Sequence, residues 1–109
     1  MSEREWRFYI SDMIASAEKV LSYTADMKQS DFEINDLTYD ATIRNIEIIG
    51  EAATHIPEDI RKQHPEIPWR MVIATRNQLI HGYLGIDNDI LWNIVSADIP
   101  ELLPKLQAL

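Results

Sequence analysis

The sequence predicts an all-α protein, a helical bundle of four longer helices and one short helix. Three observations predict this fold class. Apolar residues recur three and four positions apart along most of the chain. No segment shows the strict alternation that marks a strand. Capping residues and prolines fall where the apolar stripes begin and end. The 109 residues contain no internal repeat, so we expect a single domain over residues 1–109.

The first predicted helix begins with a capping box. Ser2 can accept a hydrogen bond from the first turn, and Glu5, three positions later, can accept one in return. Its apolar side consists of Trp6, Tyr9, Ile10, Met13, Ile14, Ala17, Val20 and Leu21. We expect this helix to end near Lys28 and the polar residues 29–36 to form a break.

The second predicted helix carries small residues on its apolar side. That side consists of Tyr39, Ile43, Ile46, Ile49, Gly50 and Ala53. Gly50, Ala52 and Ala53 leave room for another helix to approach closely.

Prolines mark the connections that follow. Pro57 suits the first turn of a short third helix that runs to about His64, and Pro65 and Pro68 bracket the connection into a fourth helix that Gly82 should end.

The last predicted helix starts with Asp87 or Asn88 as its cap and bends where Pro100 removes a backbone donor. It should bury Leu91, Ile94, Val95, Leu102, Leu103 and Leu106.

Composition narrows the class of protein. With 46% hydrophobic residues the chain can bury a small core, which oligomerisation would supplement. The absence of cysteine excludes disulfides and thiolate metal sites. A charged start without a signal peptide and the lack of a long apolar run predict a cytoplasmic protein without a membrane span.

The net charge of −8 argues against general coating of RNA, because such proteins usually present a basic surface. A local basic cleft within an acidic exterior remains possible, and the exterior itself could dock a basic partner or simply aid solubility. The residues that could line such a cleft are Arg44, Arg61, Lys62, Arg70 and Arg76.

The segment from Arg76 to Tyr83 contains the side chains best suited to catalysis. Arg76 occupies a position of the fourth helix where a hydrophobic residue is expected, so it needs a carboxylate, an interface or a phosphate. His81 lies about 140° from Arg76 on an ideal helix, and Gly82 would let the chain unwind to bring the two together. Tyr83 could place its hydroxyl in the same space.

These groups suit metal-independent cleavage of RNA by its 2′-hydroxyl. The imidazole can accept or donate a proton, and the guanidinium can stabilise charge on the phosphate. Since each chain offers one such histidine, a twofold dimer would supply both the base and the acid.

Other interpretations stay open. His81 and Gly82 could simply end a helix, and Tyr83 could close the bundle. Arg76 could be held by Glu47 or Glu51, one turn apart on the second helix.

The remaining groups predict no further site. His55 and His64 are expected to be surface or capping residues, and no metal or cofactor site is expected. Trp69 and Trp92 are expected to be core or interface anchors.

The motif Arg76-Asn77-x-x-x-His81-x-Tyr83 resembles the signature of the HEPN superfamily. The similarity to its HepT-like toxin branch extends over roughly residues 45–106. It includes, in order, the segments Ile49-Gly50-Glu51-Ala52-Ala53, His64-Pro65-Glu66-Ile67-Pro68-Trp69, Leu84-Gly85-Ile86-Asp87, Trp92 and Asp98-Ile99-Pro100.

The resemblance implies an all-helical homodimer that acts as a metal-independent endoribonuclease toxin. Arg76 and His81 would be the catalytic pair, with Asn77, Tyr83 and Glu51 as supporting residues. It also implies a minimal nucleotidyltransferase antitoxin that silences the toxin by transferring AMP to Tyr83, where added phosphate would repel RNA. The alternative is a non-catalytic adaptor that binds and regulates a nucleotidyltransferase.

Overall fold

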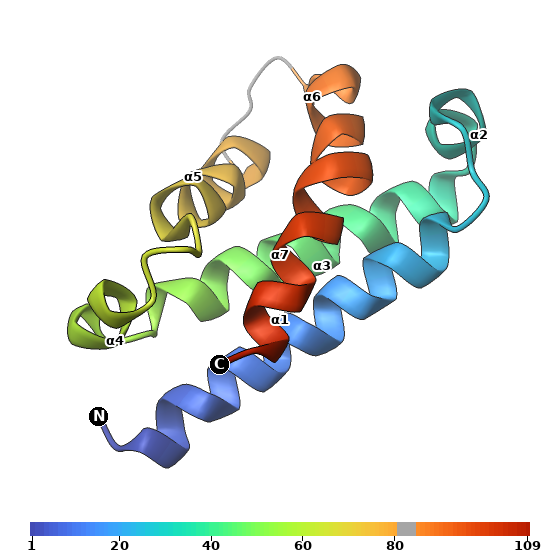
Figure 1. Cartoon of the computed structure of the whole chain (residues 1–109). Helices are drawn as coiled ribbons and strands as arrows, with labels where there is room; N and C mark the ends of the chain where they lie inside the picture. The colour runs from blue at the N-terminus through green and yellow to red at the C-terminus, as the bar shows by residue number, and fades with distance from the viewer. Residues whose placement is uncertain (81–84) are drawn as a thin grey trace.

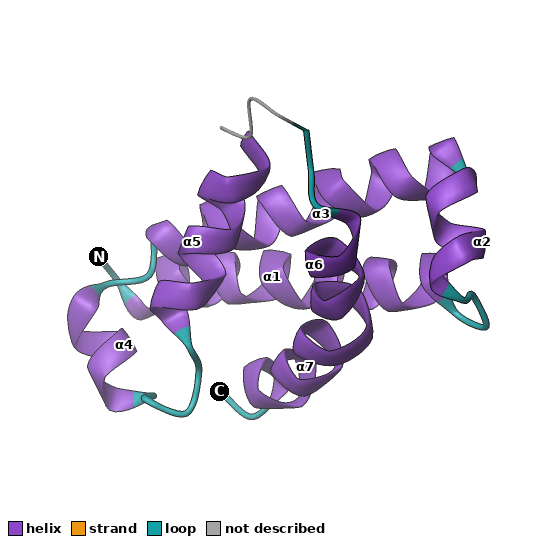
Figure 2. Cartoon of the chain, turned by 90° about the horizontal axis from the view of Figure 1, so that it is seen from above, coloured by secondary structure: helices purple, strands orange, loops and turns teal. Residues whose placement is uncertain are grey.

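The computed structural model describes residues 1–80 and 85–109, and within them every regular element is a helix (Figure 2). The elements in chain order are α1 (Glu3–Thr24), α2 (Gln29–Ile34), α3 (Asp36–Thr54), α4 (Glu58–Gln63), α5 (Trp69–Ile80), α6 (Asn88–Asn93), the π-helical turn η1 (Ile94–Asp98) and α7 (Ile99–Gln107). The predicted all-α fold class is confirmed.

The two longest helices, α1 and α3, run side by side in opposite directions (Figure 1). Helix α5 packs against α3, and α7 packs against α1, so the α1–α3 pair supports both. The core between them contains Trp6, Ile10, Met13, Ala17, Val20, Phe32, Ile46, Ile49, Ala52, Ala53, Ile56, Ile67, Trp69, Leu91, Ile94, Val95, Ile99, Leu102 and Leu106. No helix in the described residues is long and apolar enough to cross a bilayer.

Helix α1 starts as predicted and ends earlier than predicted. The Ser2 hydroxyl accepts a hydrogen bond from the Glu5 backbone N–H at 3.3 Å. The helix ends at Thr24 rather than near Lys28, because Asp26 adopts a left-handed conformation with a φ of 62°. An α-helix cannot continue through that conformation.

The predicted polar break over residues 29–36 is wrong, because residues 29–34 form helix α2. Its apolar residue Phe32 is fully buried, and the Phe32 ring lies 5.2 Å from the Tyr39 ring and 5.4 Å from the Trp92 ring, between centroids. One buried aromatic side chain thus anchors a helix whose other side chains, including that of Ile34, are not buried. The Asn35 side chain then caps α3 by accepting a hydrogen bond from the Thr38 N–H at 3.0 Å.

Helix α4 begins and ends close to the predicted places, and α5 begins close to its predicted place. Pro57 is the N-cap of α4 rather than part of its first turn, and Pro68 immediately precedes α5. Gly82, the predicted end of α5, lies outside the described residues.

The last predicted helix is interrupted by a wide turn. Asp87 caps α6 through hydrogen bonds that its carboxylate accepts from the backbone N–H groups of Asp89 and Ile90. The predicted bend at Pro100 takes the form of η1, which ends two residues before this proline. Leu103 is only partly buried, whereas the other residues predicted to be buried here are buried. If α6, η1 and α7 count as one helix, the described residues form the four longer helices expected and two short ones instead of one.

Candidate functional site

Arg76 reaches the site from the side of α5 that packs on α3. Gly50 of α3 permits this contact, since a Cβ atom on Gly50 would lie 2.4 Å from the Cβ of Arg76. The Nε of Arg76 then lies 3.2 Å from Oε2 of Glu51, the residue after that glycine. With 27% of its side chain exposed, Arg76 remains accessible to a ligand. The expectation that small residues on α3 admit another helix is confirmed at Gly50.

Glu51 also contacts a second basic side chain. Its other carboxylate oxygen, Oε1, lies 3.4 Å from Nε2 of His55, which directly follows the last residue of α3. The His55 ring stacks on the Tyr9 ring of α1, with 4.6 Å between centroids and 11° between planes. The four residues Arg76, Glu51, His55 and Tyr9, here named the Arg76 cluster, therefore join helices α1, α3 and α5.

The Arg76 cluster borders an open hollow of about 330 Å³. This volume lies within the range of about 300–1,000 Å³ that small-molecule sites occupy. The remaining lining residues are Asp12, Arg44, Glu47, Ile48 and Ala52. Nη1 of Arg44 lies 3.7 Å from Oε2 of Glu47, so a second ion pair contributes to the wall. The hollow thus combines cations, carboxylates and two aromatic rings.

The sequence left two candidate partners for Arg76, and the structure selects one of them. Glu51 pairs with Arg76, while Glu47 pairs with Arg44. Asn77 is exposed on α5. His81 and Tyr83 lie outside the described residues, so their roles stay predictions.

His55 and Tyr9 are members of the cluster that the sequence did not indicate. His55 is exposed and follows the last residue of α3, as expected for a surface or capping residue, yet it also contacts Glu51 and Tyr9. Its position four residues after Glu51 was a signal for an ion pair on one helix face. No local pattern indicated Tyr9, which is 46 residues away from His55 and was assigned to the apolar side of α1.

Comparison with known proteins identifies the family. The family model described as Ribonuclease HepT-like matches residues 13–109. This chain belongs to the HepT-like ribonuclease family. The resemblance to the HepT-like branch inferred from the sequence is thereby confirmed.

Relatives of this HepT-like chain match over almost its whole length. A protein named probable ribonuclease HepT from Thermococcus cleftensis is 40% identical, with 98% of this chain and 97% of the relative covered. A candidate RNase of Methanocaldococcus jannaschii is 38% identical, with 98% of each chain covered. A second candidate RNase of that organism is 32% identical, with 98% and 88% covered. No solved structure matches the chain.

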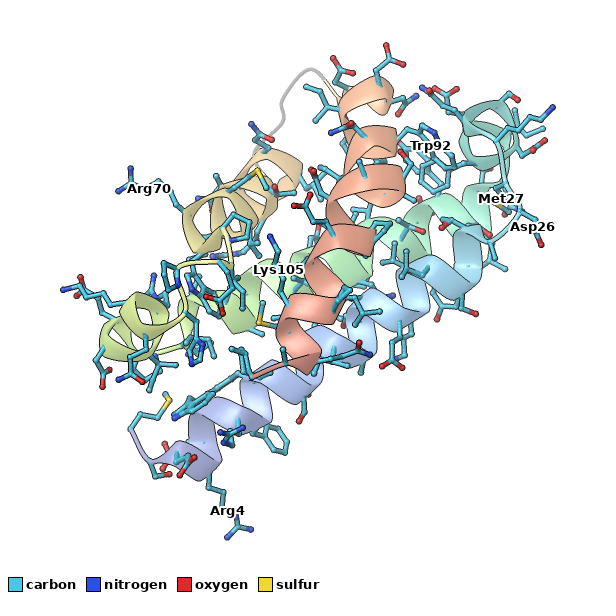
Figure 3. The ribbon with its side chains drawn as sticks, in the orientation of Figure 1. Arg4, Asp26, Met27, Arg70, Trp92 and Lys105 are labelled. Atoms are coloured by element: carbon cyan, nitrogen blue, oxygen red, sulfur yellow. The ribbon has the colours of Figure 1, made fainter. Side chains whose placement is uncertain are left out.

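The five basic residues that were expected to line one cleft of this HepT-like chain separate into two places. Arg44 and Arg76 line the hollow of the Arg76 cluster. Arg61, Lys62 and Arg70 line another hollow of about 340 Å³ between α4 and α5. Figure 3 shows Arg70 extending from α5 away from the helices around it. The second hollow also contains Glu58, so its charged side chains sum to +2 within a chain whose net charge is −8.

The other side of α5 borders a groove toward α6 and η1. One hollow of about 390 Å³ is lined by Met71, Thr75, Gln78, Asp89, Ile90, Asn93, Ile94 and Asp98. Met71 and Ile90, on opposite walls, are 47% and 51% exposed. Burial, assisted by the charge of Glu101, raises the pKa of the Asp98 carboxyl above its ordinary value.

Within residues 1–80 and 85–109, no three histidine or acidic side chains gather as a metal site would require.

Proposed function

We propose that this HepT-like protein is a metal-independent endoribonuclease, and that Arg76 and His81 carry the reaction. The observation that carries the proposal is the placement of Arg76. Its guanidinium lies beside Glu51, at the edge of an open hollow, on the helix that leads directly into His81. Family membership supports the reaction class, and the ion pair gives a partly buried arginine a defined orientation.

In the proposed reaction the 2′-oxygen of one ribose attacks the adjacent phosphorus atom. A neutral His81 removes the proton of the 2′-hydroxyl, and a protonated His81 donates a proton to the departing 5′-oxygen. The bond from phosphorus to the 5′-oxygen breaks, which leaves a 2′,3′-cyclic phosphate and a 5′-hydroxyl. Arg76 stabilises the negative charge that builds on the phosphate oxygens.

Because each chain provides one His81, the proposed enzyme is a homodimer in which two copies of the single-domain chain share the reaction cleft. The groove beside α5 supports association. Its walls expose Met71 and Ile90, and large apolar side chains that are left open beside one another often mark an interface.

The same motif suggests how the activity is controlled. We propose that the protein is the cytoplasmic toxin of a toxin–antitoxin pair whose antitoxin, a minimal nucleotidyltransferase, transfers AMP to Tyr83. The hydroxyl of Tyr83 lies two residues after His81 in the sequence. A phosphate bound there would add negative charge where the RNA backbone must approach, and so would prevent substrate binding.

RNA digestion by the purified protein tests the reaction. His81→Ala and Arg76→Ala should each abolish cleavage, while the control Arg4→Ala, at the exposed start of α1, should cleave like the parent. Gel filtration should show the same dimer for all forms. Full cleavage by His81→Ala would refute the assignment. A parent protein that cuts no RNA but co-purifies with a nucleotidyltransferase would favour the adaptor alternative.

Intact mass spectrometry tests the control step. Co-expression with the proposed antitoxin, a minimal nucleotidyltransferase, should raise the mass in steps of one AMP, and Tyr83→Phe should show no increase. If Tyr83→Phe gained the same mass as the parent, AMP would be attached to a residue other than Tyr83.

A further inference from the structure

We propose that the stacked pair of Tyr9 and His55 is a platform for one unpaired base of the RNA, next to the phosphate held by Arg76. This inference rests on the proposed ribonuclease function and adds a base subsite to it. It concerns residues of α1 and α3 that lie outside the Arg76–Tyr83 motif.

The geometry of the Arg76 cluster links the platform to the cation. Glu51 contacts Arg76 with one oxygen and His55 with the other, at 3.2 Å and 3.4 Å. Only one carboxylate group therefore lies between the guanidinium and the imidazole. This separation is comparable to the distance between the phosphate of a nucleotide and its own base. The side chain of His55 is 44% exposed, and both rings line the open hollow. A base can therefore extend the existing stack, as aromatic side chains commonly permit in binding of single strands.

The distribution of charge indicates which part of a nucleotide belongs at each end. Besides Glu51, the hollow holds two carboxylates, Asp12 and Glu47, and Glu47 is paired with Arg44. Asp12 forms no ion pair with any residue that the structure describes. The Asp12 carboxylate, one turn after Tyr9 on α1, repels a phosphate but accepts hydrogen bonds from a neutral base. The phosphate is therefore placed at the Arg76 end and the base at the Tyr9–His55 end.

The carboxylates also select among bases. Adenine, cytosine and guanine each present an exocyclic amino group, a donor that a carboxylate can accept from. Uracil presents carbonyl oxygens on both sides of its single N–H, and these oxygens would be repelled by the Asp12 carboxylate. We therefore expect the subsite to favour amino-bearing bases over uracil.

Binding to RNA that cannot be cleaved tests the platform without relying on activity. The probes are two 2′-O-methyl tetranucleotides, one of cytidines and one of uridines, which lack the attacking hydroxyl. The chain has three histidines, so proton NMR can follow each Cε1–H signal after assignment by His55→Gln, His64→Gln and His81→Gln. The cytidine probe should shift the His55 signal upfield and leave the His64 signal unchanged, and the uridine probe should shift His55 less. An unchanged His55 signal at saturation, or no binding of either probe, would overturn the proposal.

Substitutions separate stacking from the polar contact with Glu51. His55→Phe removes the polar contact but keeps an aromatic ring, whereas His55→Ala removes both. Affinity for the cytidine probe should fall about tenfold in His55→Ala and in Tyr9→Leu, as expected for the loss of one base stack, and should stay near the parent value in His55→Phe. The matched control is His64→Ala, which alters a histidine near Glu66 outside this hollow. An equal loss in His55→Phe and His55→Ala would show that only the contact with Glu51 matters and would overturn the platform.

Failure of the platform and failure of the enzyme give different results. If the parent cleaves RNA while Tyr9→Leu and His55→Ala bind and cut every sequence as the parent does, the ribonuclease assignment stands and the platform is wrong. If the parent cuts no RNA yet the cytidine probe shifts His55, the platform stands without the enzyme.

Discussion

Helices α1 and α5 both lie along α3, but they are packed differently (Figure 1). Helix α1 buries residues along its whole length, from Trp6 to Thr24. Of the α5 side chains from Trp69 to Leu79, only Trp69 is buried, and the others are partly buried or exposed. We therefore expect the α1–α3 pair to contribute most of the stability. Helix α5 holds Arg76, and its side away from α3 borders an open groove. Changes in the first region should lower stability most, and changes at α5 should affect activity first.

The largest loss of stability should come from Phe32→Ala, at the far end of the α1–α3 pair. Removal of this fully buried ring, which packs on Tyr39 and Trp92, should lower the free energy of unfolding by about 3–5 kcal/mol. Denaturant unfolding measures the change. Ile34→Ala, on the same short helix but 83% exposed, is the control and should change stability by about 0.5 kcal/mol or less. Equal effects of the two substitutions would show that α2 does not anchor the fold.

Gly50→Ala tests the close contact between α3 and α5. The added Cβ would lie 2.4 Å from the Cβ of Arg76 and 3.2 Å from the Val72 carbonyl oxygen, so α5 must move away from α3. We expect a loss of about 1–3 kcal/mol from overpacking and a larger proportional loss of RNA cleavage, because Arg76 is displaced from Glu51. Denaturant unfolding and RNA digestion measure the two. Ala15→Leu, on the exposed side of α1, should change neither. A more stable and fully active Gly50→Ala protein would contradict the close packing.

The helices and most of the core were predictable because their signals are local. Ser2, Asp87 and the prolines mark helix ends, and apolar spacing marks the buried sides. Helix α2 was missed because Phe32 alone anchors it, and its partner Trp92 is distant in sequence. The Arg76–Glu51 pair could be named as one of two alternatives, since one turn of α3 separates Glu47 from Glu51. The stack of Tyr9 on His55 could not be predicted, because it depends on how α1 and α3 align.

A smaller effect is expected from Thr42→Val, within the supporting pair. The Thr42 hydroxyl is buried and finds no hydrogen-bond partner among the residues that the structure describes. Valine has a similar shape without the hydroxyl, so stability should rise by about 1 kcal/mol. Thermal unfolding measures the shift. Thr24→Val is the control, because the Thr24 hydroxyl donates a hydrogen bond to the Val20 carbonyl at 2.8 Å, and its loss should not stabilise the protein. A rise in both variants would argue against the unsatisfied hydroxyl as the cause.

The smallest effect concerns Asp98, which faces the open side of α5. Burial, with a contribution from Glu101, raises the pKa of Asp98, so the folded protein binds this proton more tightly than the unfolded chain does. The charged form therefore lowers stability at neutral pH, and this penalty disappears as the pH falls through the raised value toward 3.8. Asp98→Asn should be slightly more stable than the parent at neutral pH, and the difference should shrink on acidification. Unfolding curves at several pH values measure this difference in stability. A difference between Asp98→Asn and the parent that stays constant with pH would show that the raised pKa of Asp98 is not its cause.

The wide turn η1 sets the rotational phase between the two helices that it joins. Its N–H···O bond spans five residues, from Ile99 back to Ile94, instead of four. Because each residue turns an α-helix by about 100°, one residue fewer in this turn would rotate Leu102 and Leu106 away from α1. The chain length between Ile94 and Asp98 thus decides which surface of α7 meets the core, while Ile94 and Val95 of the same turn are themselves buried in that core. We expect the turn to accept exchanges at its exposed residues, Ser96 and Ala97, but no change in its length.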